Sequence, residues 1–244
     1  MSGAALLWRQ YRFERRMFWR NPSAAFFNFA LPLIFLFLIA SVFGLNSKDR
    51  EILVPGIAGM SVMTTTFTAL AFNVTFLREQ GILKRIKGTP LPPLAYFGGL
   101  IGNAVVNAVV QVALVIAIGR VVYSVPLPHE WFELVVFVVL GVVAFSALGI
   151  AMAQAIPNFD SAAAYVNAVF LPMIFISGAF YDSKHLPAVV DAAARVLPLR
   201  HVIDGLRGSI VPASGLTHHV EGLVVLGVWA AAGIFLAVRY FRWE

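Results

Sequence analysis

The chain has 244 residues, of which 60% are apolar and only 12% are charged, and its mean hydropathy is +0.84. Soluble domains carry about 25% charged residues, and a chain of this length has too little interior for so many apolar side chains, which excludes a water-soluble protein. The absence of Cys excludes disulfides and thiolate metal sites. The net charge of +6 comes from basic residues between apolar runs, which favours a membrane surface over nucleic acid.

The first predicted element is an amphipathic helix within residues 1–22. Arginines at helical spacing occupy one side and aromatic residues the other, a pattern typical of a helix in the membrane interface. Arg15 falls among the aromatic residues, so it either snorkels or meets a partner. The segment is too long for a signal peptide, and the alternative role is a plain positive-inside anchor. The residues expected in the interface are Trp8, Arg9, Arg12, Arg16 and Trp19.

Six apolar segments then predict one all-α polytopic membrane domain over residues 23–244, because a span needs roughly 20 apolar residues. Lys and Arg are more numerous in the gaps that share a side with the N-terminus, so we expect both termini to be cytoplasmic and the chain to lie in the cell membrane. Asp160 is the expected N-cap of the fifth span. The predicted spans are residues 24–44, 53–77, 94–123, 131–155, 161–181 and 220–240.

Residues 78–93, REQGILKRIKGTPLPP, interrupt the apolar pattern between the second and third spans. Each basic residue buried in lipid would cost about 2.5–3.5 kcal/mol, so this loop must lie outside the membrane. Between Arg78 and Lys87 there is one Gly and no Pro, and a partial apolar face followed by prolines predicts a short, stiff helix. The alternative is a solvated loop that only sets the topology.

Neutral polar residues, and no Asp, Glu, Lys or Arg, occupy the middles of the spans, which argues against a proton- or ion-coupled carrier. Asn103, Asn107 and Gln111 share one face of the third span, and Thr65 and Thr68 lie on one face of the second. These side chains either hydrogen-bond neighbouring helices, or their own backbone in the case of Thr, or they line a pathway.

Residues 182–218 precede the last span on the outer side and are partly apolar. Asp204 and Arg207, three positions apart, can pair on a helix. His218 and His219 are adjacent and would point apart on a helix, so we expect no metal site.

Two stretches resemble the ABC-2-type permeases, the membrane subunits of type V ABC exporters. The loop at 78–93 reads R-E, a glycine, a basic amphipathic turn and then T-P-L, as in bacterial members of that family. The later stretch NAVFLPMIFISGAFYDSKHLPAVVDAAARVLPLRHVIDGLRG resembles the family's C-terminal signature, and the resemblance covers essentially the whole chain. The positions that carry the second motif are Asn167, Pro172, Ser177, Gly178, Leu186, Pro187, Pro198, Leu199, Leu206 and Arg207.

The resemblance implies that the loop is a coupling helix that docks on a separate ABC ATPase, with the N-terminal helix as the connecting helix beside it. It also implies short external helices that re-enter the outer leaflet near the exit, where Ser177, Gly178, Pro187, Pro198 and Arg207 would lie. The coupling residues would be Arg78, Glu79, Gly81, Lys84, Arg85 and Lys87.

The second and fifth spans would line the pathway at a dimer axis, because six helices make half of the family's twelve-helix pathway. We therefore expect a second copy of this chain or a sister permease as a partner. The pathway candidates are Thr65, Thr68, Phe72, Asn107, Asn167 and Phe170.

No Gly-Lys pair occurs in the chain, so it has no P-loop, and ATP and Mg²⁺ are expected on the partner subunit. The motifs H-E-x-x-H and G-x-S-x-G and paired mid-span aspartates are also absent, so we expect no catalytic residue. The expected function is the permease subunit of an ATP-driven exporter of an amphiphile such as a drug, antibiotic or lipid. The alternatives are a permease for a lipid-linked polysaccharide, and a channel or membrane scaffold that uses no ATP.

Overall fold

The computed structural model describes residues 3–42, 46–181, 187–210 and 220–243. All regular elements in these residues are helices, and six are long and apolar enough to cross a membrane, which confirms the predicted all-α fold with six spans. The elements are α1 (Gly3–Arg20), α2 (Pro22–Val42), α3 (Ser47–Met63), the π-helical turn η1 (Thr64–Thr68), α4 (Ala69–Glu79), α5 (Ile82–Lys87), α6 (Pro93–Tyr123), α7 (Trp131–Ala155), α8 (Phe159–Ile176), α9 (Ala188–Val196), α10 (Pro198–Ile210) and α11 (Val220–Tyr240).

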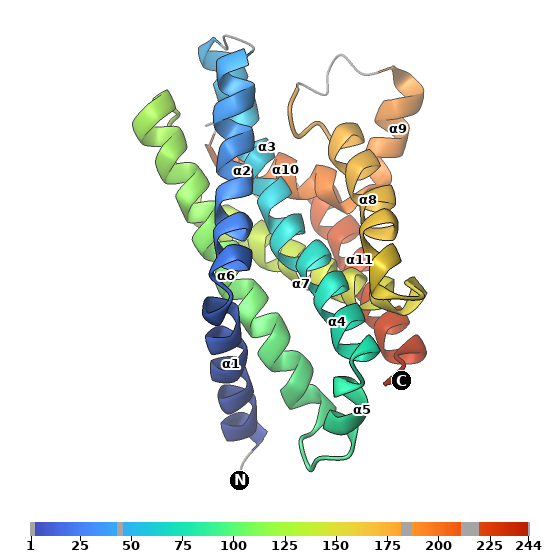
Figure 1. Ribbon diagram of the computed structural model, residues 1–244. Coiled ribbons are helices and arrows are strands. Elements are labelled where there is room, and N and C mark those ends of the chain that lie inside the picture. The colour runs from blue at the N-terminus through green and yellow to red at the C-terminus, as the bar shows by residue number, and fades with distance from the viewer. Residues whose placement is uncertain (1–2, 43–45, 182–186, 211–219, 244) are drawn as a thin grey trace.

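The helices form an elongated bundle (Figure 1). The N-terminus and α5 lie at its lower end, the C-terminal end of α11 lies toward that end, and α9 lies at the upper end. We call the end that holds α5 the inner end and the opposite end the outer end. The spans α2 and α8 stand on either side of α3 and α4, with α7 behind them.

The helix α1 runs beside the first half of α6 and leads directly into α2 (Figure 1). A Cβ atom added at Gly98 on α6 would lie 2.8 Å from the Leu7 side chain, so glycine permits this close approach. The helix therefore follows α6 lengthwise, and the predicted place of α1 in the membrane interface stays a prediction.

The second span is one continuous rod made of α3, η1 and α4, and it extends beyond the predicted residues 53–77 at both ends. A capping box begins it, because the Asn46 side chain accepts from the Asp49 amide at 3.0 Å and the Asp49 carboxylate accepts from the Asn46 amide at 3.3 Å. At η1 the rod meets α7, where a Cβ on Gly149 would lie 2.6 Å from the Phe67 carbonyl oxygen.

The fifth span is shorter than the predicted residues 161–181, because α8 ends at Ile176 and a turn follows with Gly178 at φ 76°. The expectation that Asp160 caps this helix is wrong. The cap is Asn158, whose side-chain oxygen accepts a hydrogen bond from the Ser161 amide at 2.9 Å. Asp160 lies in the first turn, where its charge still favours the helix N-terminus.

The short helix α10 is enclosed by α3, α7 and α11 and is buried along most of its length. Its apolar side chains, such as Val202 and Ile203, are fully buried in the main core. A Cβ on Gly59 of α3 would lie 2.6 Å from the Ile203 side chain, so a glycine again allows the approach. The packing places this helix inside the bundle, while its external location and its depth in a membrane stay predictions.

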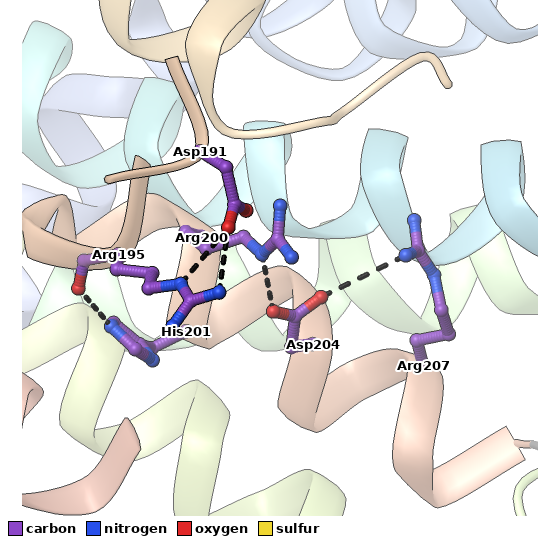
Figure 2. Close-up of polar contacts among 6 residues, drawn as sticks. All are labelled: Asp191, Arg195, Arg200, His201, Asp204 and Arg207. Carbon is purple, nitrogen blue, oxygen red and sulfur yellow. Dashed lines mark hydrogen bonds and ion pairs between the residues drawn. The ribbon is translucent and has the colours of Figure 1, made fainter. Parts of the chain in front are cut away.

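Charged side chains on α9 and α10 form the cluster shown in Figure 2. Asp204 lies between Arg200 and Arg207, and the predicted pair with Arg207 is present at 3.7 Å. On α9, Arg195 pairs with Asp191 at 2.7 Å. The ring of His201 on α10 contacts the Arg195 carbonyl oxygen at 2.7 Å and so joins the two helices.

Candidate functional site

The predicted coupling residues lie at the inner end, where α4, α5 and the turn between α7 and α8 meet (Figure 1). The sequence predicts a short helix between Arg78 and Lys87, and the structure contains it as α5 but starts it only at Ile82. The helix α4 ends at Glu79, where Gly81 takes a left-handed conformation with φ 67° and its amide donates to the Arg78 carbonyl oxygen at 2.9 Å. A separate helix of six residues, α5, then begins. Glycine adopts this conformation without steric cost, which is why the helix stops there.

Arg78 and Glu79 bind other parts of this same chain. The Arg78 guanidinium donates a hydrogen bond of 2.7 Å to the Ala153 carbonyl oxygen and another to that of Ile156. These carbonyls belong to the C-terminal end of α7, where no further helical turn supplies donors. The Glu79 carboxylate accepts from the Phe159 amide at the start of α8. The two side chains therefore fix the end of α4 to both helices.

The helix α5 is anchored by apolar residues, chiefly Leu83, and its cationic side chains are exposed. Leu83 is fully buried in a cluster with Val74 and Leu100. Lys84, Arg85 and Lys87 are exposed. The arrangement is a cationic surface fixed to the second, fourth and fifth spans, and a force on α5 would reach all three.

The helix α1 lies at the same end and carries the predicted interfacial residues. Arg9, Arg12 and Arg16 are exposed, and Trp8 and Trp19 are 57% and 55% exposed. Other aromatic side chains of α1 contact the bundle. Tyr11 lies 3.4 Å from the position of a Cβ atom added at Gly102, and the centres of the Phe18 and Phe29 rings are 5.9 Å apart.

Arg15 meets a partner, which resolves the two alternatives that the sequence left open. Its guanidinium donates a hydrogen bond to the Asn107 side chain on α6 and lies 5.4 Å from the centre of the Trp19 ring. Nearby, burial raises the pKa of the Glu14 carboxyl group, and a hydrogen bond from Gln10 partly opposes this. The contact between α1 and α6 thus contains two ionisable side chains, Glu14 and Arg15, that the protein partly buries.

The polar residues of the third span pack helices together. Asn107 is only 4% exposed and accepts from Arg15. Gln111 donates to the Phe29 carbonyl oxygen on α2 at 3.2 Å. Thr65 on the second span donates to the Ser61 carbonyl oxygen of its own helix at 2.8 Å. For these residues the geometry favours the packing alternative over a role in a pathway.

The other pathway candidates lie on the second span, in η1 and α4, and on α8. Asn167 is exposed, whereas Thr68, Phe72 and Phe170 are half-buried. Phe72 packs edge-to-face on Phe159 at 6.2 Å. Only 17% of the apolar window of α2 and 22% of that of α8 are buried, compared with 61% for α7. A large apolar face with a few neutral polar groups is therefore left uncovered by the single chain.

The residues of the predicted exit motif shape the turns between α8 and α10. Ser177 and Gly178 are buried in the turn after α8, next to Ala179. Pro187 precedes α9 as its N-cap residue, and Pro198 begins α10. Arg207 contacts Asp204 (Figure 2), whereas Leu186 lies outside the described residues.

Sequence reasoning missed the turn between α7 and α8 as part of the site. Arg78 and Glu79 form hydrogen bonds there with backbone carbonyl oxygens and a backbone amide. Every residue type has such groups, so the sequence does not predict these partners. The one available signal was Asn158 as a capping residue.

Comparisons with known proteins show the family of this chain. The profile of the ABC-2 type transporter family matches residues 3–211. Nodulation protein J of Rhizobium leguminosarum bv. trifolii is 27% identical over 244 residues, which cover 92% of this chain and 90% of that protein. Nodulation protein J of Rhizobium meliloti strain 1021 is 26% identical over 226 residues, 88% of this chain and 84% of that protein.

The inner membrane transport permease YadH of Escherichia coli strain K12 is 26% identical over 158 residues, 64% of this chain and 61% of that protein. The family match and the six apolar helices together indicate a multi-pass membrane component of a transporter, for which the family implies a separate ABC ATPase. The chain belongs to the ABC-2 type transporter family as a transport permease subunit.

Proposed function

We propose that this chain is the permease subunit of an ATP-driven exporter and that α5 is the surface on which the ATPase docks. The observation that carries the proposal is the double attachment of α4 to the ends of α7 and α8 by Arg78 and Glu79. A docking surface that is fixed to three spans transmits a rigid-body movement that a flexible loop would absorb. In this proposal ATP and Mg²⁺ bind to the partner subunit, and both termini are cytoplasmic.

The pathway lies between two permease subunits, on the face formed by α2, the second span and α8. Support comes from the exposed apolar surface of α2 and α8 and from the exposed, uncharged polar side chain of Asn167. An exposed apolar face of this extent suits a helix-packed dimer, made with a second copy or a sister permease. Its aromatic, uncharged character suits an amphiphilic substrate such as a drug, an antibiotic or a lipid.

The test uses the complex of the permease with its ATPase subunit in membrane vesicles. Exchange of Arg85 and Lys87 for Glu should release the ATPase subunit during purification and abolish ATP-driven transport of amphiphiles, because both side chains are exposed cations on α5. The control is Arg120→Glu, which reverses an exposed charge near the other end of α6. Transport that survives the α5 exchange, or fails equally in the control, would exclude α5 as the dock.

A further inference from the structure

A cleft of about 500 Å³ opens between α8 and α11, with α7 and η1 as its floor. Its size lies within the range of about 300–1,000 Å³ that small-molecule sites occupy. None of the proposed pathway residues lines it, although α8 borders both the cleft and the face proposed to lie between two permeases. Most of its lining is apolar and includes Phe67, Phe145, Leu148, Met152, Val169 and Met173.

The inner end of the cleft is polar and cationic. Gln154, Tyr240 and Arg242 line it where α7 and α11 end. The backbone amide of Arg242 donates to the Gln154 side-chain oxygen at 2.9 Å, which holds the residues after α11 against α7. The Arg242 side chain is exposed, so its charge is available to a ligand at this end.

Trp229 marks the opposite end of the cleft. Its indole nitrogen donates to the Val196 carbonyl oxygen, where α9 ends, at 2.7 Å. Trp229 and Tyr240 are eleven residues apart on α11, and at 1.5 Å per residue this corresponds to about 16 Å. Half of a hydrocarbon core of about 30 Å is about 15 Å, so the cleft is as deep as one leaflet.

Positive charge at the inner end is incompletely balanced. Arg242 acts electrostatically on Arg78, and two cations repel. Arg78 is engaged with carbonyl oxygens of α7, and among the described residues no carboxylate forms an ion pair with Arg242. An anion beside Arg242 would relieve the repulsion between the two guanidinium groups.

We propose that the cleft binds an anionic phospholipid of the leaflet in which α11 ends. One acyl chain lies along α7 toward Trp229, and the phosphate accepts hydrogen bonds from Arg242 and Gln154. The lipid enters sideways between α8 and α11, of which only 22% of the apolar windows are buried. A zwitterionic lipid such as phosphatidylcholine fits the same apolar walls and also carries a phosphate, but its choline cation offsets that charge, so its headgroup adds no net negative charge beside Arg242. The site does not depend on which substrate the permease moves.

The test measures lipid binding in the cleft as quenching of the fluorescence of Trp229. The full chain, with its four other tryptophans, Trp8, Trp19, Trp131 and Trp243, replaced by Phe, is placed in phosphatidylcholine vesicles. A small fraction of the lipid is phosphatidylglycerol or phosphatidylcholine with brominated acyl chains, which quench tryptophan on contact. We expect brominated phosphatidylglycerol to quench with about fivefold higher apparent affinity, the effect of one basic residue near an anionic lipid.

Arg242→Gln should remove this preference, whereas Arg239→Gln should keep it, because Arg239 lies on the same helix end but outside the cleft, over the Tyr240 ring. Ala151→Phe fills the cleft and should reduce quenching by both lipids. If that variant loses its helical circular dichroism, Ala155→Phe at the exposed inner rim replaces it.

Equal quenching by the two lipids in the parent chain would overturn the proposal, as would an equal loss of preference in both arginine variants. Quenching that the filled cleft leaves unchanged would show that Trp229 reads lipid outside it. A Trp229 that neither lipid quenches would show that protein, such as a second permease copy, covers the cleft.

Discussion

Arg78 joins the end of the second span to the end of the fourth through a hydrogen bond of 2.7 Å to the Ala153 carbonyl oxygen. A charged residue in a predicted coupling loop is ordinarily interpreted as a contact for the partner subunit. Here it is an internal brace, which separates two roles within one short stretch: Arg78 and Glu79 hold the site in place, and the exposed cations of α5 face outward.

The first prediction concerns this brace. Arg78→Gln should lower the free energy of unfolding by about 1.5–3 kcal/mol, because hydrogen bonds to a charged group are lost and carbonyls at the end of α7 are left without donors. Thermal unfolding of the purified permease in detergent measures the change. The matched control is Arg85→Gln, whose side chain is exposed and should leave the midpoint unchanged. A brace that matters only for ATPase binding would instead leave both variants as stable as the parent.

The second prediction concerns the turn at Gly81. Gly81→Ala should cost about 1–2 kcal/mol, because φ is 67° there and a Cβ atom disfavours the left-handed region. Space is not the cause, since nothing lies within 4 Å of the added Cβ. Gly88→Ala, at φ −79° and with its nearest contact at 3.4 Å, should be close to neutral in the same unfolding assay. Equal effects of the two changes would contradict the conformational explanation.

The third prediction compares the two acidic residues of Figure 2. Asp204 serves two arginines whose side chains are only 14% and 20% exposed, so Asp204→Asn should destabilise the protein by about 1–3 kcal/mol. Asp191 pairs with Arg195, which is 69% exposed, and Asp191→Asn should change stability by less than about 1 kcal/mol. Chemical or thermal unfolding of the two variants and of the parent protein measures these changes in stability. The account of α10 as a buried helix fails if the Asp191 change is the more damaging one.

The fourth prediction is a pH dependence at the contact between α1 and α6. Burial raises the pKa of Glu14 above its ordinary value of 4.5, so the folded state holds the proton more tightly than the unfolded state. The stability from this group is therefore complete below pH 4.5 and is lost as the pH rises through the folded-state pKa.

Glu14→Gln removes the charge and keeps a side-chain oxygen that can accept the hydrogen bond from Gln10. The variant should be more stable than the parent at neutral pH, and the difference should shrink as the pH falls toward 4.5. Unfolding midpoints of both proteins across this range measure it. A difference that stays constant with pH would show that Glu14 does not titrate differently on folding.

The family resemblance was already visible in the residues of the loop and of the late motif, and the family match confirms it. The six spans were predictable because twenty or so apolar residues in a row have few alternatives to a membrane helix. The exposed cations of α5 followed from the cost of placing charge in lipid. These are properties of single segments, so composition and spacing are sufficient to determine them.

Only the tertiary structure decided which polar groups serve packing and which face outward. Asn107 and Gln111 share a helix face with the same spacing that a pathway would show, and what distinguishes them is that α1 and α2 lie against that face. Arg78 likewise differs from Arg85 only through the backbone carbonyls that α7 brings to it. Such partners come from segments that are distant in the sequence and are often backbone atoms. The types of the residues next to Arg78 or Asn107 in the sequence therefore do not predict them.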